Sequence, residues 1–546
     1  MKPSYHPILL FFFISQLSFF ACVGSSTNST ALFHVGVVLD LNSWVGKVAQ
    51  SCISMAISDF YARHQDYNSK IVLHTRDSKG DVVSAASAAL DLMKNVQVQA
   101  IIGPQRSAEA KFMIDLGKKA HVPIISFSAT SPSLSPTHSP YFVRTTQDDS
   151  SQVQAIVAIV QAFGWGEVVP IYEDTEYGNG FIPYLIDGFQ GIYTRVPYRS
   201  VIPPSANDFH IIRELKKLKG NQTRVLVVHM TASLGSRLFA LAKEEGMMTK
   251  GYAWIITDGL SGMLDLMTPS TIDSMQGVLG IKPYIPRSKD LEDVEMRWKR
   301  ELFLKDPNNK MNELNLFGIR AYDTTWALAM AVERVGPMNY RFLKSQTSEN
   351  LTDLATLGTS EMGPRILKTI LNTSFKGLSG EFHLVEGQLQ SSAFQIFNVI
   401  GKGERVIGYW TPKKGLSQEL DVAEKVAYST SMADLKKPIW PGDSITIPKG
   451  WVISTKGNTL RIGVPMKKGF TEFVDVKWDS QTKKTTHIDG FSIAVFRGVL
   501  GKLPFGVTPH FIPYMKADGS SDGSYDNLVY EVHLQSFEAQ LDNISA

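Results

Sequence analysis

Short apolar segments alternate with amphipathic helices along the first half of this chain of 546 residues. His34–Leu41 has the character of a strand, and apolar residues then recur at helical spacing over residues 45–60. The same order returns with the strand candidates Ala100–Gly103 and Pro123–Phe127, which are separated by another amphipathic helix. Strands that alternate with helices build βαβ units around a parallel sheet. The sequence therefore predicts an α/β fold.

The alternation begins again near residue 150, after the Ser/Pro-rich loop Ser131–Pro140. Arg224–Met230 is a nearly continuous apolar run, which is typical of a strand covered on both faces. We expect the helix Ile319–Val335 and the segment Gly380–Trp410 to return the chain to the first lobe, with Phe394–Ile400 and Arg405–Trp410 as a closing hairpin. The pattern thus predicts a clamshell of two α/β lobes, with a cleft at the carboxyl ends of the strands.

The composition changes after residue 411. Residues 412–459 are rich in Pro, Gly and Lys and include Pro438-Ile439-Trp440-Pro441-Gly442, which predicts a linker. We therefore expect a two-lobed domain at 31–411, a linker at 412–459 and a small domain at 460–546, which has few elements with which to bury a parallel sheet. The elements predicted for the small domain are strand Leu460–Pro465, helix Ile493–Gly501, strand Val507–Ile512 and helix Asp522–Val532.

The N-terminus has the order of a secretory signal peptide, predicted at residues 1–24. Lys2 precedes the apolar run Ile8–Val23, and small residues follow from Gly24. A membrane anchor is the alternative, although the run is short for a bilayer span and is interrupted by polar residues. The mature chain is expected to be secreted and to carry N-glycans on Asn28, Asn221, Asn350, Asn372 and Asn543, each of which begins an Asn-x-Ser/Thr sequence.

Composition excludes several classes of function. The formal net charge of +3 is spread along the chain without a basic block, so nucleic acid is not an expected partner. The two cysteines exclude a disulfide-rich scaffold and a cysteine-based zinc site, and Cys52 is expected to be an inert buried thiol. The histidines show no metal-binding spacing, and catalytic and nucleotide-binding motifs are missing. We therefore expect no enzyme, no metal and no cofactor.

Two predicted strands of the first lobe end in polar residues that suit a carboxylate. Ser107 follows the first of them and opens a helix, where its hydroxyl and the free amides can hold an anion. Capping of its own helix is an equally supported role for Ser107. Ala129 and Thr130 follow the next strand and reach the same edge of the sheet. Together these residues predict a site for the carboxylate of a small zwitterion.

The second lobe offers complementary groups. Asp258 ends the predicted strand Tyr252–Thr257 and suits an ammonium group, although capping of the following helix is the alternative. Tyr177 precedes a Gly-Asn-Gly sequence, and we interpret it as a residue of a turn or as an aromatic wall of the cleft.

The linker and the segment after it resemble the plant glutamate receptor-like channels. The resemblance covers essentially the whole mature chain. It is specific in the second domain, whereas the motifs of the first domain are shared with class C receptors and bacterial amino-acid-binding proteins. It rests on Ile439-Trp440-Pro441-Gly442, Pro448-Lys449-Gly450-Trp451, Leu460–Pro465, Lys468-Gly469-Phe470, Glu472-Phe473-Val474, Asp522–Tyr530, and, upstream, Ile102-Gly103-Pro104-Gln105, Ile124–Thr130 and Phe142–Thr146.

The resemblance implies a bilobed periplasmic-binding-protein type I domain followed by a type II agonist domain, in a tetrameric cation channel of the plasma membrane that is gated by amino acids. The implied partners are an amino acid or small peptide and full-length glutamate receptor-like subunits, in homo- or hetero-oligomers. By position, the residues that fall where relatives of this fold hold an amino acid are Ser107, Ala129, Thr130, Tyr177 and Asp258.

The sequence departs from the family pattern at its end. Where the family continues into an Asp-x-x-Ile-Thr segment and the arginine that pairs with the agonist carboxylate, this chain has Phe537–Ala546. We therefore expect a C-terminally truncated subunit whose residues 460–546 form an incomplete agonist domain, without a pore, acting as a soluble ligand-binding or assembly fragment. The alternatives are a secreted, non-signalling interaction protein and an incomplete gene model of a full ligand-gated ion channel.

Overall fold

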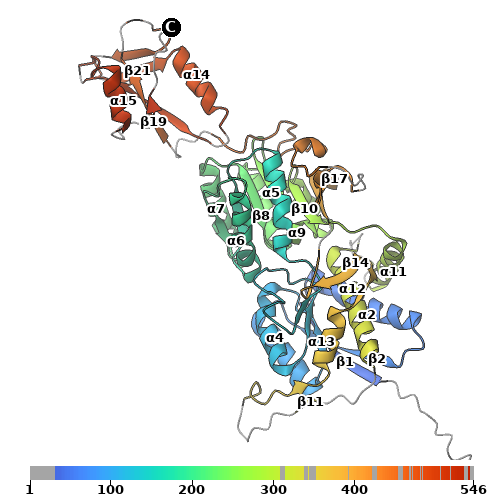
Figure 1. Ribbon diagram of the computed structural model, residues 1–546. Coiled ribbons are helices and arrows are strands. Elements are labelled where there is room, and N and C mark those ends of the chain that lie inside the picture. The colour runs from blue at the N-terminus through green and yellow to red at the C-terminus, as the bar shows by residue number, and fades with distance from the viewer. Residues whose placement is uncertain are drawn as a thin grey trace, which may run out of the picture.

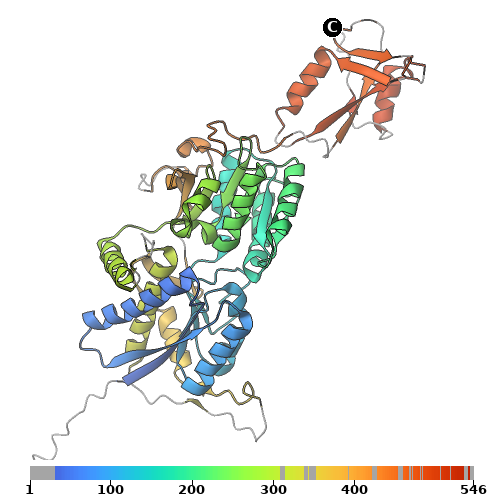
Figure 2. The ribbon, with the colours of Figure 1, turned by 180° about the vertical axis from the view of Figure 1, so that it is seen from behind.

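The computed structural model describes residues 31–540, except 306, 308–313, 337–341, 344–351, 391–392, 421–426, 453–458, 467–468, 470, 480, 483, 504–505, 517 and 534–538. The expected signal peptide and the sequons at Asn28, Asn350 and Asn543 lie outside the described residues. Figures 1 and 2 show two lobes stacked end to end, with a smaller C-terminal unit beyond the second lobe.

The first lobe is built on an eight-stranded sheet with the order β13-β14-β15-β5-β4-β3-β1-β2. Strands β1 to β5 pair in parallel, as the alternating pattern predicted. The strands are β1 (Ala31–Leu39), β2 (Ser69–Asp77), β3 (Ala100–Ile102), β4 (Ile124–Ser126), β5 (Phe142–Arg144), β13 (Ser374–Gly377), β14 (Gly380–Val385) and β15 (Gln388–Leu389).

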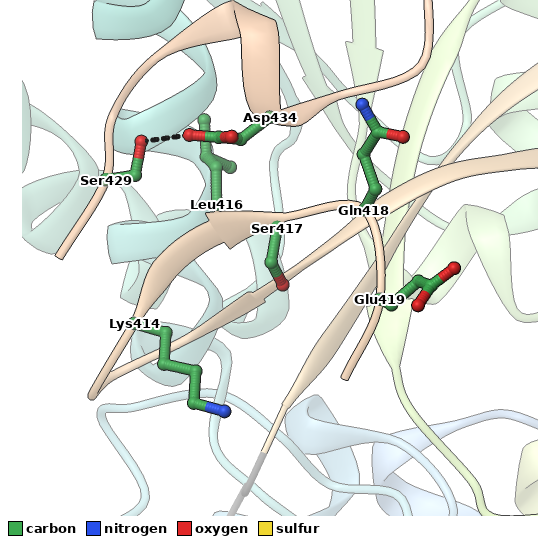
Figure 3. Close-up of a pocket in the computed structure, with 7 residues that line it drawn as sticks. All are labelled: Lys414, Leu416, Ser417, Gln418, Glu419, Ser429 and Asp434. Carbon is green, nitrogen blue, oxygen red and sulfur yellow. Dashed lines mark hydrogen bonds between the residues drawn. The ribbon is translucent and has the colours of Figure 1, made fainter. Parts of the chain in front are cut away.

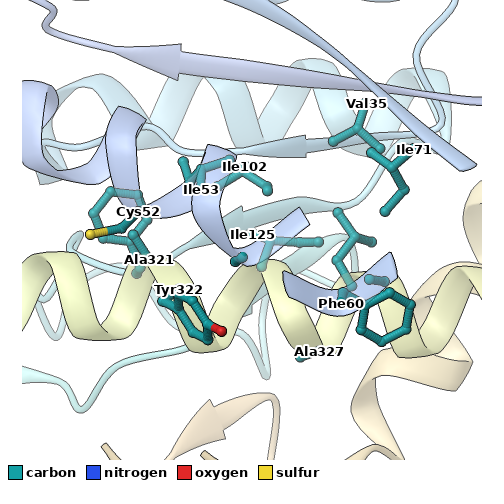
Figure 4. Close-up of a cluster of buried hydrophobic side chains, with 14 of the residues drawn as sticks. Val35, Cys52, Ile53, Phe60, Ile71, Ile102, Ile125, Ala321, Tyr322 and Ala327 are labelled. Carbon is teal, nitrogen blue, oxygen red and sulfur yellow. The ribbon is translucent and has the colours of Figure 1, made fainter. Parts of the chain in front are cut away.

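Helices cover both faces of this sheet (Figure 1). One face carries α2 (Trp44–Arg63), α12 (Leu316–Val335) and α13 (Gly363–Leu371). The opposite face carries α3 (Val82–Asp91) and α4 (Ser107–Ala120). Figure 4 shows the first of these interfaces, where Cys52 of α2 lies near Ala321 of α12 and Phe60 of α2 lies near Ala327 of α12.

The second lobe repeats the plan with the sheet order β18-β17-β16-β10-β9-β8-β6-β7. Helices α5 (Val153–Ala162) and α6 (Glu176–Gln190) pack on one face, and α7 (Asp208–Gly220) and α8 (Ala232–Glu244) on the other. The strands are β6 (Val169–Glu173), β7 (Ser200–Ile202), β8 (Val225–His229), β9 (Ala253–Ile256), β10 (Leu279–Pro283), β16 (Phe394–Ile400), β17 (Gly403–Thr411) and β18 (Gly415–Ser417).

One expectation about chain path was wrong. The predicted hairpin is present as β16 and β17, but β16 pairs antiparallel with β10 and so belongs to the second lobe. The elements that do return to the first lobe are α12, which packs on α2, and β13 to β15. The hairpin lies in the second lobe because Phe394, Ile396 and Phe397 fill the core there.

The described part of the predicted linker packs closely against the second lobe. Trp440 is buried in its core, and the indole nitrogen of Trp165 donates to the Pro448 carbonyl at 2.8 Å. Trp451 forms an antiparallel bridge with Thr223. The segment therefore follows the surface of the second lobe before it reaches the C-terminal unit.

The C-terminal unit contains the four elements predicted from the sequence. They are β19 (Thr459–Pro465), α14 (Phe491–Leu500), β22 (Thr508–Tyr514) and α15 (Tyr525–His533). A hairpin of β20 (Asp475–Asp479) and β21 (Lys484–Asp489) was not predicted. The small core of the C-terminal unit consists of Ile462, Val464, Val474 and Ile493. Among the described residues, no helix is both long and apolar enough to cross a bilayer.

Candidate functional site

In both sheets the direction of the strand order reverses at equivalent positions. In the first lobe β1 lies between β2 and β3, and in the second lobe β6 lies between β7 and β8. In open α/β sheets of this kind, ligands bind at the carboxyl ends of the strands beside such a switch point. Polar residues that follow β4, β5, β6, β8 and β9 meet there, between the two lobes.

Two carboxylates of the second lobe are joined by one amide. The Gln152 side-chain nitrogen donates to Asp258 Oδ1 at 2.9 Å and to Asp149 Oδ1 at 3.1 Å. The Asp258 backbone N–H in turn donates to Gln152 Oε1 at 3.1 Å. Asp149 also ties the two lobes together, because its backbone N–H donates to the Thr130 carbonyl at 2.9 Å.

Both carboxylates are in an environment that disfavours their charged form. Burial, reinforced by the charge of Asp258, holds the pKa of Asp149 well above its ordinary value. Burial also raises the pKa of Asp258, while the positive charge of Arg320 opposes that rise. Asp149 Oδ2 is buried and has no hydrogen-bond partner among the described residues. A cationic group placed here would stabilise both carboxylates.

An aromatic stack lies beside these acids. The Tyr177 ring stacks on His229 with centroids 4.1 Å apart, and Phe181 stacks on His229 at 4.2 Å. His229 Nε2 donates to the Tyr177 carbonyl at 3.3 Å, so Nδ1 accepts from the Thr257 hydroxyl at 2.9 Å. Burial lowers the pKa of His229 to about 3, so the imidazole is neutral. The Tyr177 hydroxyl is buried and has no partner within the described part of the chain.

The first lobe contributes a buried arginine. Arg320 of α12 is 2% exposed, and its guanidinium donates to Gln147 Oε1. The nearby charges that act on it are those of Asp258 and Asp149. Burial lowers its pKa only to about 10, so Arg320 stays positively charged at neutral pH.

The predicted residues of the first lobe lie at this edge, but their polar groups are engaged. Ser107 is buried, and its hydroxyl oxygen accepts from the Ser131 N–H at 3.2 Å rather than capping α4. The Ala129 N–H donates to the Ser126 hydroxyl oxygen at 2.9 Å, so it is not a free amide. The Thr130 carbonyl accepts from Asp149 and from Arg144. The Ala129 N–H is therefore engaged within the chain, whereas the Ser107 hydroxyl accepts its bond and keeps its own hydrogen to donate.

The two predicted residues of the second lobe lie together in the cleft. Tyr177 is not in a turn, because Glu176 begins helix α6 and Thr175 caps it. This placement directs the Tyr177 ring toward His229. Asp258 opens the one-turn helix α9 (Asp258–Ser261), whose N-cap is Thr257, and its side chain binds Gln152. Capping is thus not the role of the Asp258 carboxylate.

Direct contacts hold the two lobes closed around this site. The Ser131 hydroxyl of the first lobe donates to the Glu176 carbonyl of α6 at 2.8 Å. The neighbouring Ser133 hydroxyl donates to the Glu176 carboxylate at 2.5 Å. These contacts must break for a ligand to enter, as in hinge closure of two-lobed binding proteins.

Three cavities in the structure are lined by other residues. Figure 3 shows one of about 270 Å³ beside β18, where Ser429 and Asp434 are hydrogen-bonded. A second, of about 460 Å³, lies between the lobes and is lined by Lys282, Glu295 and Glu404 among others. A third, of about 520 Å³, belongs to the C-terminal unit. None of these three cavities is lined by Asp149, Asp258 or Arg320.

Sequence reasoning missed four residues of this cluster: Asp149, Gln152, His229 and Arg320. Two of them stand out in the sequence. His229 interrupts the apolar strand β8, and Arg320 interrupts the apolar face of α12. A charged or polar residue inside a buried apolar run points to a specific partner. Asp149 and Gln152 lie in a polar stretch that offered no such contrast.

Metals and modification add little to the site. The described residues contain no group of three or more metal-ligating side chains. Cys52 is buried, and burial raises the pKa of its thiol to about 12, which agrees with the inert role expected for it. Asn372 is exposed and Asn221 is partly buried, and their glycosylation stays a prediction.

The buried carboxyl group of Glu109, on α4, allows the effect of a buried charge on stability to be measured. It is 1% exposed, and burial raises its pKa to about 7. The pKa of Glu109 is thus higher in the folded than in the unfolded protein, and this difference stabilises the folded state at pH values below the unfolded pKa. The stabilisation is lost as the pH rises through about 7. We expect Glu109→Gln to be more stable than the wild type at pH 8, by up to roughly 3 kcal/mol, and to lose this advantage at pH 5.

Thermal unfolding at the two pH values measures this difference. Asp115→Asn, an exposed residue of the same helix, is the control and should change neither melting temperature. Equal effects of Glu109→Gln at pH 5 and pH 8 would contradict the role given to the buried charge.

Comparison with known proteins agrees with this architecture. Residues 48–402 match the receptor family ligand binding region. The chain is 46% identical over 535 residues to glutamate receptor 2.2 of Arabidopsis thaliana, which covers 97% of this chain and 57% of that protein. It is 47% identical over 526 residues to glutamate receptor 2.7 of the same plant, covering 96% of this chain and 54% of that protein. The chain thus spans somewhat more than half the length of these relatives.

Solved structures share the fold of the two lobes. The leucine binding protein LivK of Thermotoga maritima matches with a TM-score of 0.55 and 17% identity, over 70% of this chain and 99% of that protein. The branched-chain amino acid substrate binding protein LivJ of Streptococcus pneumoniae, in complex with isoleucine, matches with a TM-score of 0.55 and 18% identity, over 69% of this chain and 98% of that one. At these identities the likeness shows the fold alone, a bilobed clamshell of the periplasmic-binding-protein type I class.

Proposed function

Because the chain belongs to the plant glutamate receptor-like family, and its two lobes to the receptor ligand-binding regions, we propose that the interlobe cleft binds a free amino acid. The names of the solved neighbours support this ligand class, since both are binding proteins for amino acids. The chain is then the extracellular ligand-sensing region of a receptor, and it is not an enzyme.

One observation carries the proposal. Asp149 Oδ2 and the Tyr177 hydroxyl are both buried without partners among the described residues, and the charge of Asp258 acts on both groups. A buried polar atom without a partner costs about 1–3 kcal/mol. An ammonium group between these atoms would give each of them a hydrogen bond. A ligand bound there would touch both lobes and would favour the closed state.

Isothermal calorimetry with the twenty L-amino acids tests the proposal on the secreted chain. We expect at least one of them to bind. Asp258→Asn is expected to weaken that binding by about 10- to 100-fold, because a charge-assisted hydrogen bond contributes about 1.5–3 kcal/mol. Asp265→Asn removes a nearby exposed carboxylate and should leave the affinity unchanged. Absence of heat and of any thermal shift with every amino acid would contradict the proposal.

The wider role that we propose for the protein also rests on its family. We propose that the chain acts outside the cell and assembles with full-length glutamate receptor-like subunits, in which cation conduction would be coupled to ligand binding. The names of the curated relatives support this proposal. The apolar residues Phe491, Val495 and Val499, four positions apart and exposed on α14, give the C-terminal unit a face suited to such association.

A further inference from the structure

We propose that Arg320 holds the α-carboxylate of the bound amino acid, while Asp258 and Asp149 hold its ammonium group. The inference rests on the proposed function, because it requires an amino acid in the cleft. It assigns the carboxylate to a residue of α12 that sequence reasoning did not include in the site, in place of Ser107, Ala129 and Thr130.

The first argument is the arrangement of opposite charges across the lobe boundary. Arg320 belongs to the first lobe, and Asp149 and Asp258 belong to the second. The two carboxylates are the charges that act most strongly on the guanidinium, yet neither comes within 4.0 Å of it to form an ion pair. The lobe boundary separates a positive group from two negative ones. A zwitterion is the smallest ligand that satisfies both sides.

The second argument is the incomplete pairing of Arg320. A guanidinium has five N–H donors in a planar fork. Within the part of the chain that the structure describes, the hydrogen bond formed by this group is the one to Gln147 Oε1. Arg320 is nevertheless almost fully buried. A guanidinium that makes one hydrogen bond among the described residues can donate two parallel N–H bonds to a carboxylate.

The third argument is that two amides of the alternative carboxylate site are engaged. The N–H groups of Ala129 and Ser131 donate to the hydroxyl oxygens of Ser126 and Ser107. A ligand carboxylate bound to these two N–H groups would have to displace both bonds. At Arg320 it would displace none among the described residues, so the arginine is the stronger site.

The arrangement also explains how a ligand would close the protein. Its carboxylate would bind α12 of the first lobe and its ammonium group would bind η2 (Asp149–Gln152) and α9 of the second. A ligand that carried one of these groups would contact one lobe alone. A ligand that favours closure by binding both lobes therefore carries both charged groups, unlike amines and simple carboxylic acids.

The test compares one amino acid with its carboxamide. The probes are the tightest binder of the L-amino-acid panel and the same compound as its C-terminal amide, which keeps the ammonium group and loses the carboxylate. We expect the wild type to bind the acid roughly 100-fold more tightly than the amide. In Arg320→Gln this ratio should fall below about fivefold. Arg334→Gln, an exposed arginine of the same helix, should keep the wild-type ratio.

A second variant covers the case in which Arg320→Gln does not fold. Arg320→Lys keeps the positive charge and loses the planar fork, so the ratio should fall to an intermediate value. A wild type that does not distinguish acid from amide would overturn the inference, and so would an Arg320→Gln or Arg320→Lys variant with an unchanged ratio. In both cases binding of the amino acid leaves the proposed function standing. If no amino acid binds, the proposed function itself fails.

Discussion

Replacing Trp440 with alanine is expected to lower the free energy of unfolding of the second lobe by about 3–5 kcal/mol. Trp440 is 1% exposed although it lies in the segment predicted to be a linker. Its ring makes edge contacts with Phe163 and Trp165, with centroids 5.1 Å and 5.7 Å away. Alanine would leave a cavity in a core that α5, β16 and the linker close together.

The backbone around Trp440 explains why the cavity would not collapse easily. Asn398 of β16 accepts from the Ile439 N–H at 2.8 Å and donates to the Ile439 carbonyl at 2.9 Å. A Cβ on Gly277 would lie 2.2 Å from the Pro441 nitrogen, so this backbone is also in close contact with the lobe. The segment is therefore held in place whether or not the indole is present.

Urea unfolding followed by circular dichroism measures the Trp440 effect. Ile445→Ala is the matched control, because this residue of the same segment is 85% exposed and should change stability by less than about 0.5 kcal/mol. A Trp440→Ala protein as stable as the Ile445→Ala protein would show that the segment does not contribute to the core.

Replacing Asp323 with alanine is expected to cost about 3 kcal/mol or more in the first lobe. The buried Asp323 carboxylate accepts from the backbone N–H groups of Leu378 and Ser379, both at 2.8 Å, and from the Ser379 hydroxyl at 2.6 Å. Alanine leaves these donors without a partner, and each buried unsatisfied donor costs about 1–3 kcal/mol. The turn that joins β13 to β14 would lose its anchor on α12.

Two variants separate this effect from a simple loss of charge. Asp323→Asn keeps one acceptor oxygen and should be less destabilising than Asp323→Ala. Asp293→Ala removes an exposed carboxylate from α11 (Lys289–Lys305) and should have almost no effect on urea unfolding. Equal losses for the alanine and asparagine variants of Asp323 would contradict the assignment of the cost to unsatisfied donors.

The cleft shows which residues could be predicted from the local sequence and which could not. Position at the end of a strand predicted Asp258, and the Gly-Asn-Gly sequence predicted Tyr177; in the structure Tyr177 stacks on His229 and the charge of Asp258 acts on Tyr177. The same reasoning did not identify Arg320, because its helix is far along the chain from the strands of the cleft. It also treated the Ala129 N–H as free, whereas the Ser126 hydroxyl three residues away occupies it.

The sequence by itself determined the α/β class, the division into two lobes and four elements of the C-terminal unit. These features follow from periodicity, since the spacing of apolar residues records which face of each helix or strand is buried. Only the tertiary structure decided that β16 and β17 join the second lobe, that Trp440 fills its core, and that the charges of two aspartates act on Arg320. Those outcomes depend on contacts between residues far apart in the chain, where the fit of side chains and the pairing of buried charges select one partner among many.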